Sequence, residues 1–293
     1  MQPGDGKPGD GKPHAVNPRD GPPRGRPPAI WGIVNVTPDS FSDGGRHATS
    51  AAAVEHGLRL VQEGADVLDV GGESTRPGAR EVPAPEETDR VVPVIRGLRE
   101  AGVAVPLSGD TRKGEVAEAA LQAGASIVND VSAGTHDPDT LRAAARHGAG
   151  VVLMHMQGRP ETMQADPRYA GDVVAEVRAW LRERVDAAKE AGIRSDAVLV
   201  DPGIGFGKRL EHNLALLSRL EELVADGVPV LLGASRKSFL GLLTGRDVGD
   251  RLAGSLACVA RALEAGVAAV RVHDVAASAD VLQVLAAIDP KQR

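Results

Sequence analysis

Eight short apolar runs in this sequence each lead into polar side chains that could do chemistry. In chain order, these side chains are Asn35, Glu73, Asp110, Asn129, His155, Asp201, Ser235 with Lys237, and Arg271 with His273. A single Asn or Asp after a strand usually caps the next helix or satisfies a turn. Polar residues after every run favour a shared purpose, the lining of one binding site.

The set divides by chemistry into two groups. One group offers two carboxylates, an amide and a cation: Asp110, Asn129, Asp201 and Lys237. This combination suits a flat heterocycle that presents several N–H donors and a carbonyl. The other group offers donors and a possible contact to a metal-bound water: Asn35, Arg271 and His273. Such residues suit a phosphate or a diphosphate.

The stretch DPGIGFGKRL looks like a phosphate-binding loop, but its spacing argues against a nucleotide P-loop. Its first and last glycines enclose three residues instead of four, and an Arg stands where the Mg²⁺-binding Ser or Thr should follow the Lys. We interpret Asp201 as the working group and the glycines as positions that let the backbone and Phe206 approach a bound ring. Lys208 is interpreted as a partly solvated structural charge.

The elements that would position these side chains alternate along the chain. Candidate strands occupy residues 29–36, 66–72, 105–110, 126–131, 150–156, 197–203, 228–235 and 268–275, each followed by a segment of helical periodicity such as the one from Val173. Eight units in about 265 residues predict an α/β fold, a (β/α)8 TIM barrel over 29–293. An open doubly wound sheet is the competing architecture. In a barrel, all strand ends meet at one mouth.

Two long loops rich in Gly and Pro would complete that mouth. NVTPDSFSDGGRH follows the first candidate strand and GGESTRPGARE follows the second. Both exceed the usual βα turn of about 2 to 6 residues. We therefore interpret them as lids or binding loops.

Composition limits the class of function. Residues 1–28 are half Gly or Pro, which predicts a disordered tail. The apolar runs are short and no signal-peptide pattern opens the chain, which argues against a membrane protein and favours the cytoplasm. The net charge of −6 argues against nucleic-acid binding and favours small-molecule partners. The lone Cys258 excludes an internal disulfide and is expected to be a small buried side chain.

The motifs together resemble the bacterial dihydropteroate synthase family. They run in order over about residues 30–275 as NVTPDSFSDGG, GGESTRPGA, SGDT, IVNDVSA, LMHMQG, DPGIGFGK, GASRKS and RVHD. The resemblance implies a TIM-barrel transferase, usually a homodimer and a sulfonamide target. Such an enzyme condenses 6-hydroxymethyl-7,8-dihydropterin diphosphate with p-aminobenzoate in folate biosynthesis, giving 7,8-dihydropteroate and diphosphate.

The resemblance also implies roles for individual residues. The pterin would be bound by Asp110, Asn129, Met154, Asp201, Phe206 and Lys237. The diphosphate would be bound by Asn35, Arg271 and His273, with Mg²⁺ as a cofactor bridging Asn35 and phosphate oxygens. The p-aminobenzoate would contact Phe41, Thr75, Arg76, Pro77 and Ser238. Catalysis, the stabilisation of a cation-like ring and a departing anion, would rest on Asp110, Asp201, Lys237 and Arg271.

Two other functions compete with this one. A pterin-binding methyltransferase barrel shares the ring contacts but has no use for a diphosphate site or an ESTRPG loop. A catalytically silent paralogue would keep the same ring contacts. Gly109, where the family usually has a β-branched residue, leaves the placement of Asp110 open.

Overall fold

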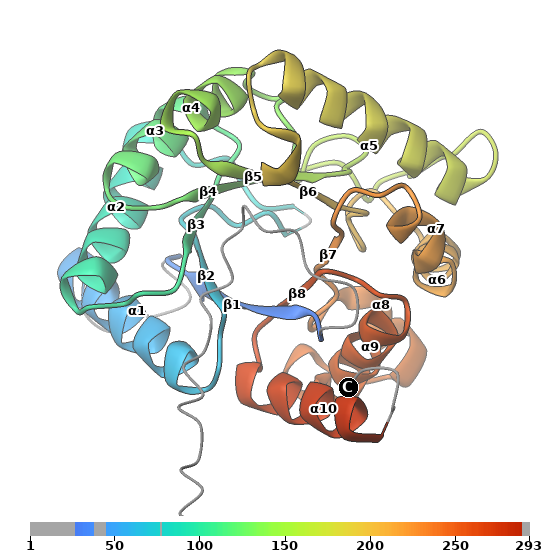
Figure 1. The fold of residues 1–293 in the computed structure, drawn as a ribbon. Helices are drawn as coiled ribbons and strands as arrows, with labels where there is room; N and C mark the ends of the chain where they lie inside the picture. Colours follow the sequence, from blue (N-terminus) through green and yellow to red (C-terminus); the bar gives the residue numbers. More distant parts are fainter. Residues whose placement is uncertain (1–26, 38–44, 77, 289–293) are drawn as a thin grey trace, which may run out of the picture.

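The predicted strands are all present and form one closed ring of parallel strands (Figure 1). The structure, a computed structural model, describes residues 27–37, 45–76 and 78–288. The strands are β1 (Ala29–Asn35), β2 (Val67–Gly71), β3 (Leu107–Asp110), β4 (Ile127–Asp130), β5 (Gly150–Met154), β6 (Val198–Asp201), β7 (Leu231–Leu232) and β8 (Ala269–Val272). They pair in the order β6-β5-β4-β3-β2-β1-β8-β7. A parallel bridge between Val200 and Val230 joins the two ends of this order.

Helices cover the outside of the ring (Figure 1). Those in the described residues are α1 (Gly45–Gln62), α2 (Ala84–Glu100), α3 (Gly114–Gln122), α4 (Asp139–His147), α5 (Val173–Glu190), α6 (Leu210–Ser218), α7 (Leu220–Val224), α8 (Ser238–Thr244), α9 (Leu252–Glu264) and α10 (Val275–Ile288). Short 3₁₀ turns occupy Ser195–Ala197 and Val248–Asp250. Because every strand is followed by at least one helix, the predicted (β/α)8 TIM barrel is confirmed.

All eight strands are shorter than predicted, and β7 differs most. It keeps two residues, Leu231 and Leu232, where 228–235 was expected. Pro229 has no N–H to donate to a sheet ladder, although its carbonyl accepts the amide of Val200 at 2.9 Å. The ladder on this edge of the ring therefore stays short.

The interior of the barrel is apolar toward the N-terminal ends of the strands and polar toward their C-terminal ends, at the mouth. One cluster of buried side chains fills the lower layer: Trp31, Val67, Ile127, Val152, Leu199, Leu231 and Ala269. Alternate residues of a strand face the same side of the sheet. Two positions further along their strands therefore stand the inward-facing Asp69, Asn129, Asp201 and Arg271. The strand alternation that points the apolar side chains into the barrel therefore also points these four polar side chains inward, at the mouth.

Gly109 has a packing explanation. It lies in β3 on the face opposite to Asp110, and a Cβ built on it would lie 3.0 Å from the Cβ of Ala120 in α3. This is closer than side chains normally pack, so the missing side chain lets α3 approach the strand. Asp110 keeps its inward position, in register with Asn129 of β4.

Gly109→Val should therefore destabilise the protein by about 1 to 3 kcal/mol through overpacking. Adding Ala120→Gly should recover part of that loss, despite the roughly 1 kcal/mol cost of a helical glycine. Urea unfolding of the parent, both single variants and the double variant measures the coupling between the two sites. Strictly additive effects would contradict close contact between β3 and α3.

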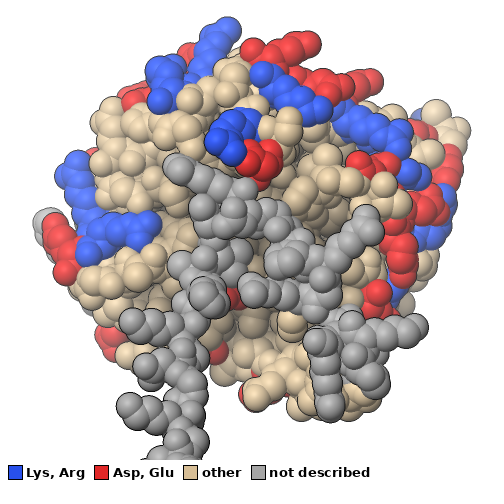
Figure 2. Space-filling model, viewed as in Figure 1, with Lys and Arg blue, Asp and Glu red and all other residues tan. Residues whose placement is uncertain are grey.

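The surface shows no face of one charge sign in the view of Figure 2. Basic and acidic side chains are interspersed around the rim, over the helices. Within the described residues, no helix is both long enough and apolar enough to span a membrane. Cys258 is buried, as expected. All but the last two residues of the expected tail, 1–28, lie outside the described residues.

Candidate active site

A single guanidinium joins three strands at the mouth of the barrel. Arg271 of β8 donates from Nε to Oδ2 of Asp69 at 2.5 Å and from Nη2 to Oδ2 of Asp110 at 2.6 Å. Asn129 of β4 donates from Nδ2 to the same Asp69 oxygen at 3.0 Å. Asp110 and Asn129 were expected to bind the heterocycle, and Arg271 was expected to bind the diphosphate. The structure joins all three in one hydrogen-bonded set with Asp69.

Asp69 is the site residue that sequence reasoning missed. Its side chain is fully buried, and its Oδ1 has no hydrogen-bond partner among the described residues. The available signal was the alternation in DVLDVGG, where Asp69 stands two positions after the inward-facing Val67. An acid at an inward strand position predicts a site more directly than an acid in the following loop.

Two carboxylates share one cation in this set. Burial raises the pKa of Asp110, although the charge of Arg271 opposes the rise. Burial alone would lower the pKa of Arg271, but the charges of Asp69 and Asp110 raise it above its ordinary value. The set therefore places several carboxyl oxygens around one guanidinium. It is therefore suited to a ligand that donates N–H groups or develops positive charge.

A second set lies on the β6 side of the mouth. Asp201 accepts the amide of Gly203 at 2.7 Å. Lys237 donates to the carbonyl of Ile204, and its Nζ lies 4.4 Å from the centroid of the Phe206 ring. Burial raises the pKa of Asp201. Burial also lowers the pKa of Lys237 to about 8, although the charge of Asp201 opposes this shift.

Gly233 and Met154 complete the wall between these sets. A Cβ on Gly233 would lie 3.3 Å from Oδ2 of Asp201 and 4.0 Å from Nζ of Lys237. The strand position after β7 thus adds no side chain to the space in front of Asp201. Met154, in register with Asp201, is buried and gives this wall an apolar surface.

The glycines after Asp201 serve backbone packing. Gly203 and Gly207 have φ values of 67° and 59°. A Cβ on Gly203 would lie 1.9 Å from the carbonyl oxygen of His155, and one on Gly207 would lie 2.5 Å from that of Gln157. Only glycine fits such a close approach at positive φ. These two glycines therefore press the loop onto the segment after β5, a role not foreseen in the sequence.

Lys208 is a structural residue, but the expectation that it is partly solvated was wrong. Its side chain is buried and contacts Nδ1 of His155 at 2.9 Å and the carbonyl of Phe206 at 3.1 Å. Burial lowers the pKa of Lys208 and, with the charge of Lys208, the pKa of His155 to about 2. His155 packs edge-on against Trp180, with 4.9 Å between ring centroids. Its imidazole is thus part of the packing behind the loop.

The remaining diphosphate residues end adjacent strands. Asn35 is the last residue of β1, and His273 follows β8. Ser235 lies within hydrogen-bond distance of His273, with 3.0 Å between its Oγ and Nδ1. Burial, followed by the charges of Arg271 and Arg236, lowers the pKa of His273 to about 4. The imidazole is therefore neutral at pH 7 and can donate one N–H to an anion.

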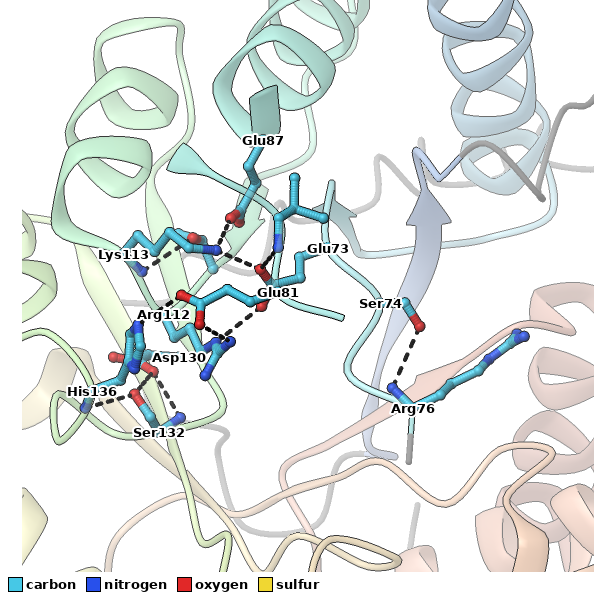
Figure 3. Close-up of polar contacts among 12 residues, drawn as sticks. Glu73, Ser74, Arg76, Glu81, Glu87, Arg112, Lys113, Asp130, Ser132 and His136 are labelled. Atoms are coloured by element: carbon cyan, nitrogen blue, oxygen red, sulfur yellow. Dashed lines mark hydrogen bonds and ion pairs between the residues drawn. The ribbon is translucent and has the colours of Figure 1, made fainter. Parts of the chain in front are cut away.

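The residues expected near p-aminobenzoate lie further out. Thr75 and Arg76 follow β2, and the amide of Arg76 donates to Oγ of Ser74 at 3.4 Å (Figure 3). Ser238 opens α8 directly after Lys237 and is exposed. Phe41 and Pro77 lie outside the described residues.

Comparison with known proteins identifies the family. A family model described as "Pterin binding enzyme" matches residues 31–273. The dihydropteroate synthase of Synechocystis sp. is 45% identical over 260 residues, covering 88% of this chain and 89% of the relative. A Xanthomonas albilineans dihydropteroate synthase solved with 4-aminobenzoic acid superposes with a TM-score of 0.83 at 53% identity, covering 89% of this chain and 93% of that one.

A second Xanthomonas albilineans structure, in complex with 7,8-dihydropteroate, has a TM-score of 0.80 and 51% identity. It covers 89% of this chain and 94% of that one. With the family model matched from β1 to the end of β8 and such identity over most of both chains, this chain belongs to the pterin-binding enzyme family, among its dihydropteroate synthases.

Proposed function

We propose that this chain condenses 6-hydroxymethyl-7,8-dihydropterin diphosphate with p-aminobenzoate to give 7,8-dihydropteroate and diphosphate. The observation that carries the proposal is the set of acceptors at the mouth, the buried Asp69 and Asp201 and the partly buried Asp110, on a chain whose relatives are dihydropteroate synthases. The solved relatives that hold 4-aminobenzoic acid and 7,8-dihydropteroate support both substrates.

The two sets divide the recognition of the pterin ring. Asp201 and Asp110 accept N–H groups from opposite sides of the ring, and Asn129 adds an amide that both donates and accepts. Lys237 donates to the ring carbonyl or a ring nitrogen. Phe206 and Met154 pack against the ring.

The reaction breaks one C–O bond and forms one C–N bond. Diphosphate leaves the pterin methylene, assisted by electron release from the ring. The neutral aniline nitrogen attacks the methylene and then loses a proton. The acceptor oxygens of Asp110 and Asp69 stabilise the positive charge that develops on the ring. Arg76, with its exposed side chain, is suited to the carboxylate of p-aminobenzoate, beside Thr75 and Ser238.

Asn35 fits the expected Mg²⁺ as a single protein ligand. Within the described ranges, no group of three acidic, His or Cys side chains forms a metal site. Mg²⁺ commonly takes one or two protein oxygens and completes its shell with water and substrate phosphates. Asn35 would hold it against the diphosphate, where it neutralises charge on the leaving group. His273 would donate to the same anion.

We also propose a homodimer in the cytoplasm. Four of the seven exposed large apolar side chains in the described residues lie on α8, the following turn and the start of α9: Leu242, Leu243, Val248 and Leu252. Neighbouring exposed apolar side chains are suited to a second copy of the chain. Light scattering coupled to size exclusion should give twice the chain mass, and Leu242→Glu with Leu243→Glu should give the monomer mass. A monomeric parent at micromolar concentration would contradict the dimer.

The test of the activity mixes purified protein with the pterin diphosphate, p-aminobenzoate and Mg²⁺ and follows dihydropteroate by mass. We expect product that depends on all three additions. Binding of the pterin diphosphate without product would contradict the proposal and favour the silent paralogue.

A further inference from the structure

A buried ion network lies beside the segment that follows β2 (Figure 3). Glu73 comes two residues after β2, Glu87 stands in the first turn of α2, and Arg112 and Lys113 follow β3. Their side chains are only 1% to 9% exposed. Two acids and two bases therefore balance each other away from solvent.

Each cation is tied to Glu73. Lys113 donates from Nζ to Oε2 of Glu73 at 2.5 Å and to Oε2 of Glu87 at 2.6 Å. Arg112 donates from Nε to Oε1 of Glu73 at 2.9 Å. Burial alone would raise the pKa of Glu73, but the bonds and charges of Lys113 and Arg112, with the amide of Val82, lower it. Glu73 is therefore a carboxylate at neutral pH.

Glu73 also joins the two ends of one loop. It accepts the amide of Val82 at 2.8 Å, so the residue that opens the segment binds the residue that closes it. Arg112 lies 3.5 Å from Glu81, one residue before that closing point. The base of the segment is therefore fixed at both ends to Arg112 and Lys113.

The same two cations follow Asp110, one of the proposed pterin-binding residues, closely in the sequence. Arg112 and Lys113 come two and three residues after Asp110, whose carboxylate contacts Arg271. Well-packed apolar side chains could stabilise such a position equally well, because burying ions carries a large desolvation cost. Charged pairs with fixed hydrogen bonds instead define which segments meet and in which register.

We propose that Glu73 is a positioning residue for the p-aminobenzoate side of the site. Held by Arg112 and Lys113, it sets the position of Thr75 and Arg76 relative to Asp110. The proposal rests on the proposed function, in which p-aminobenzoate binds beside Thr75 and Arg76.

The test is Glu73→Gln in the full chain, with each substrate varied in turn. If the segment occupies its binding position about one tenth of the time in the variant, the KM for p-aminobenzoate rises about tenfold. The KM for the pterin diphosphate should stay within about twofold, because the ring contacts remain on the strands. Hydrogen exchange should show a less protected amide at Val82.

Asp226→Asn is the matched control. Asp226 accepts from Arg178 at 2.8 Å and from Arg182 at 2.5 Å, and it lies after α7, on the chain leading into β7. The control also removes an acid bound by two cations, but away from the strand ends that form the mouth. We expect both KM values and the exchange at Val82 to match the parent.

Two outcomes overturn the inference. One is an unchanged KM for p-aminobenzoate in Glu73→Gln, and the other is an equal rise of both KM values. If Glu73→Gln does not fold, Glu73→Asp, which keeps the charge but shortens the reach, is judged by the same criteria. A parent that makes no dihydropteroate contradicts the proposed function, whereas an active parent with an unaffected variant contradicts the positioning role alone.

Discussion

Arg271→Met should reduce dihydropteroate synthesis at least about a hundredfold and destabilise the protein by about 3 to 5 kcal/mol. The variant keeps the inner part of the side chain but removes the guanidinium, which leaves Asp69 and Asp110 without their shared cation. Removing one partner of a buried ion pair costs more than the pair contributes, because the remaining charge stays desolvated. Urea unfolding and steady-state kinetics measure the two effects.

The loss of stability in Arg271→Met should grow with pH. In the parent, burial raises the pKa of Asp110 to about 8, against the lowering effect of Arg271. Without Arg271, this pKa rises further. A raised carboxyl pKa gives stability that is complete below the unfolded pKa and is lost as pH rises through the folded pKa. The folding stability of the variant therefore continues to fall above about pH 8. In this range the contribution of Asp110 to the stability of the parent no longer changes with pH.

Unfolding at pH 6 and pH 9 tests this pH dependence, with Arg178→Met as the control. Arg178 also pairs with two acids, Asp226 and Glu222, but near the surface. We expect the control to lose about 1 kcal/mol or less at both pH values and to keep its activity. An Arg271→Met deficit that is the same at both pH values would contradict the buried pairing with Asp110.

Asp201→Asn should lower kcat/KM for the pterin diphosphate about a hundredfold, equivalent to about 2.7 kcal/mol of transition-state stabilisation. The change keeps the volume but replaces one acceptor oxygen by a donor facing the N–H groups of the ring, and such a mismatch is costly in a buried site. Burial disfavours the charge of Asp201, so a neutral side chain should leave folding stability within about 1 kcal/mol of the parent.

Asp130→Asn separates loss of recognition from loss of structure. Asp130 follows Asn129 but faces the outside of the barrel, where it accepts from the amides of Ser132 and Gly134 at 2.7 Å and 2.8 Å. This variant should lose about 1 to 3 kcal/mol of stability with little change in pterin affinity. Calorimetric titration with the pterin diphosphate compares the pterin affinities of Asp130→Asn and Asp201→Asn. Equal affinities for Asp201→Asn and the parent would remove Asp201 from the ring site.

Much of the site could be predicted because barrel topology alone brings the strand ends together. The prediction used only the position of Asp110, Asn129 and Asp201 at the ends of candidate strands, and no knowledge of distances was needed. The partner of Arg271 could not be predicted in the same way. Several acids share the mouth, and only the register between β8, β2 and β3 decides which of them lie within 3 Å of the guanidinium.

The environment of Lys208 shows a second limit. Two of its three acceptors are backbone carbonyls, those of His155 and Phe206. A carbonyl has no signature in the side-chain sequence, so a lysine enclosed by carbonyls looks the same as a solvated one. The contact between Gly109 and Ala120 was hidden for a related reason, because it depends on how closely a helix approaches a strand.

The apolar layer beneath the site closes the barrel interior at the N-terminal ends of the strands, so the site opens at their C-terminal ends. Trp31, Ile127 and Leu231 are almost completely buried in this layer, so molecules enter and leave on the side of the strand ends. In the proposed arrangement the pterin ring lies deepest and p-aminobenzoate lies nearer the rim. The two substrates therefore use the same entrance one after the other. A p-aminobenzoate that arrives first stands in the path of the pterin, and the next pterin enters only after the whole of dihydropteroate has left.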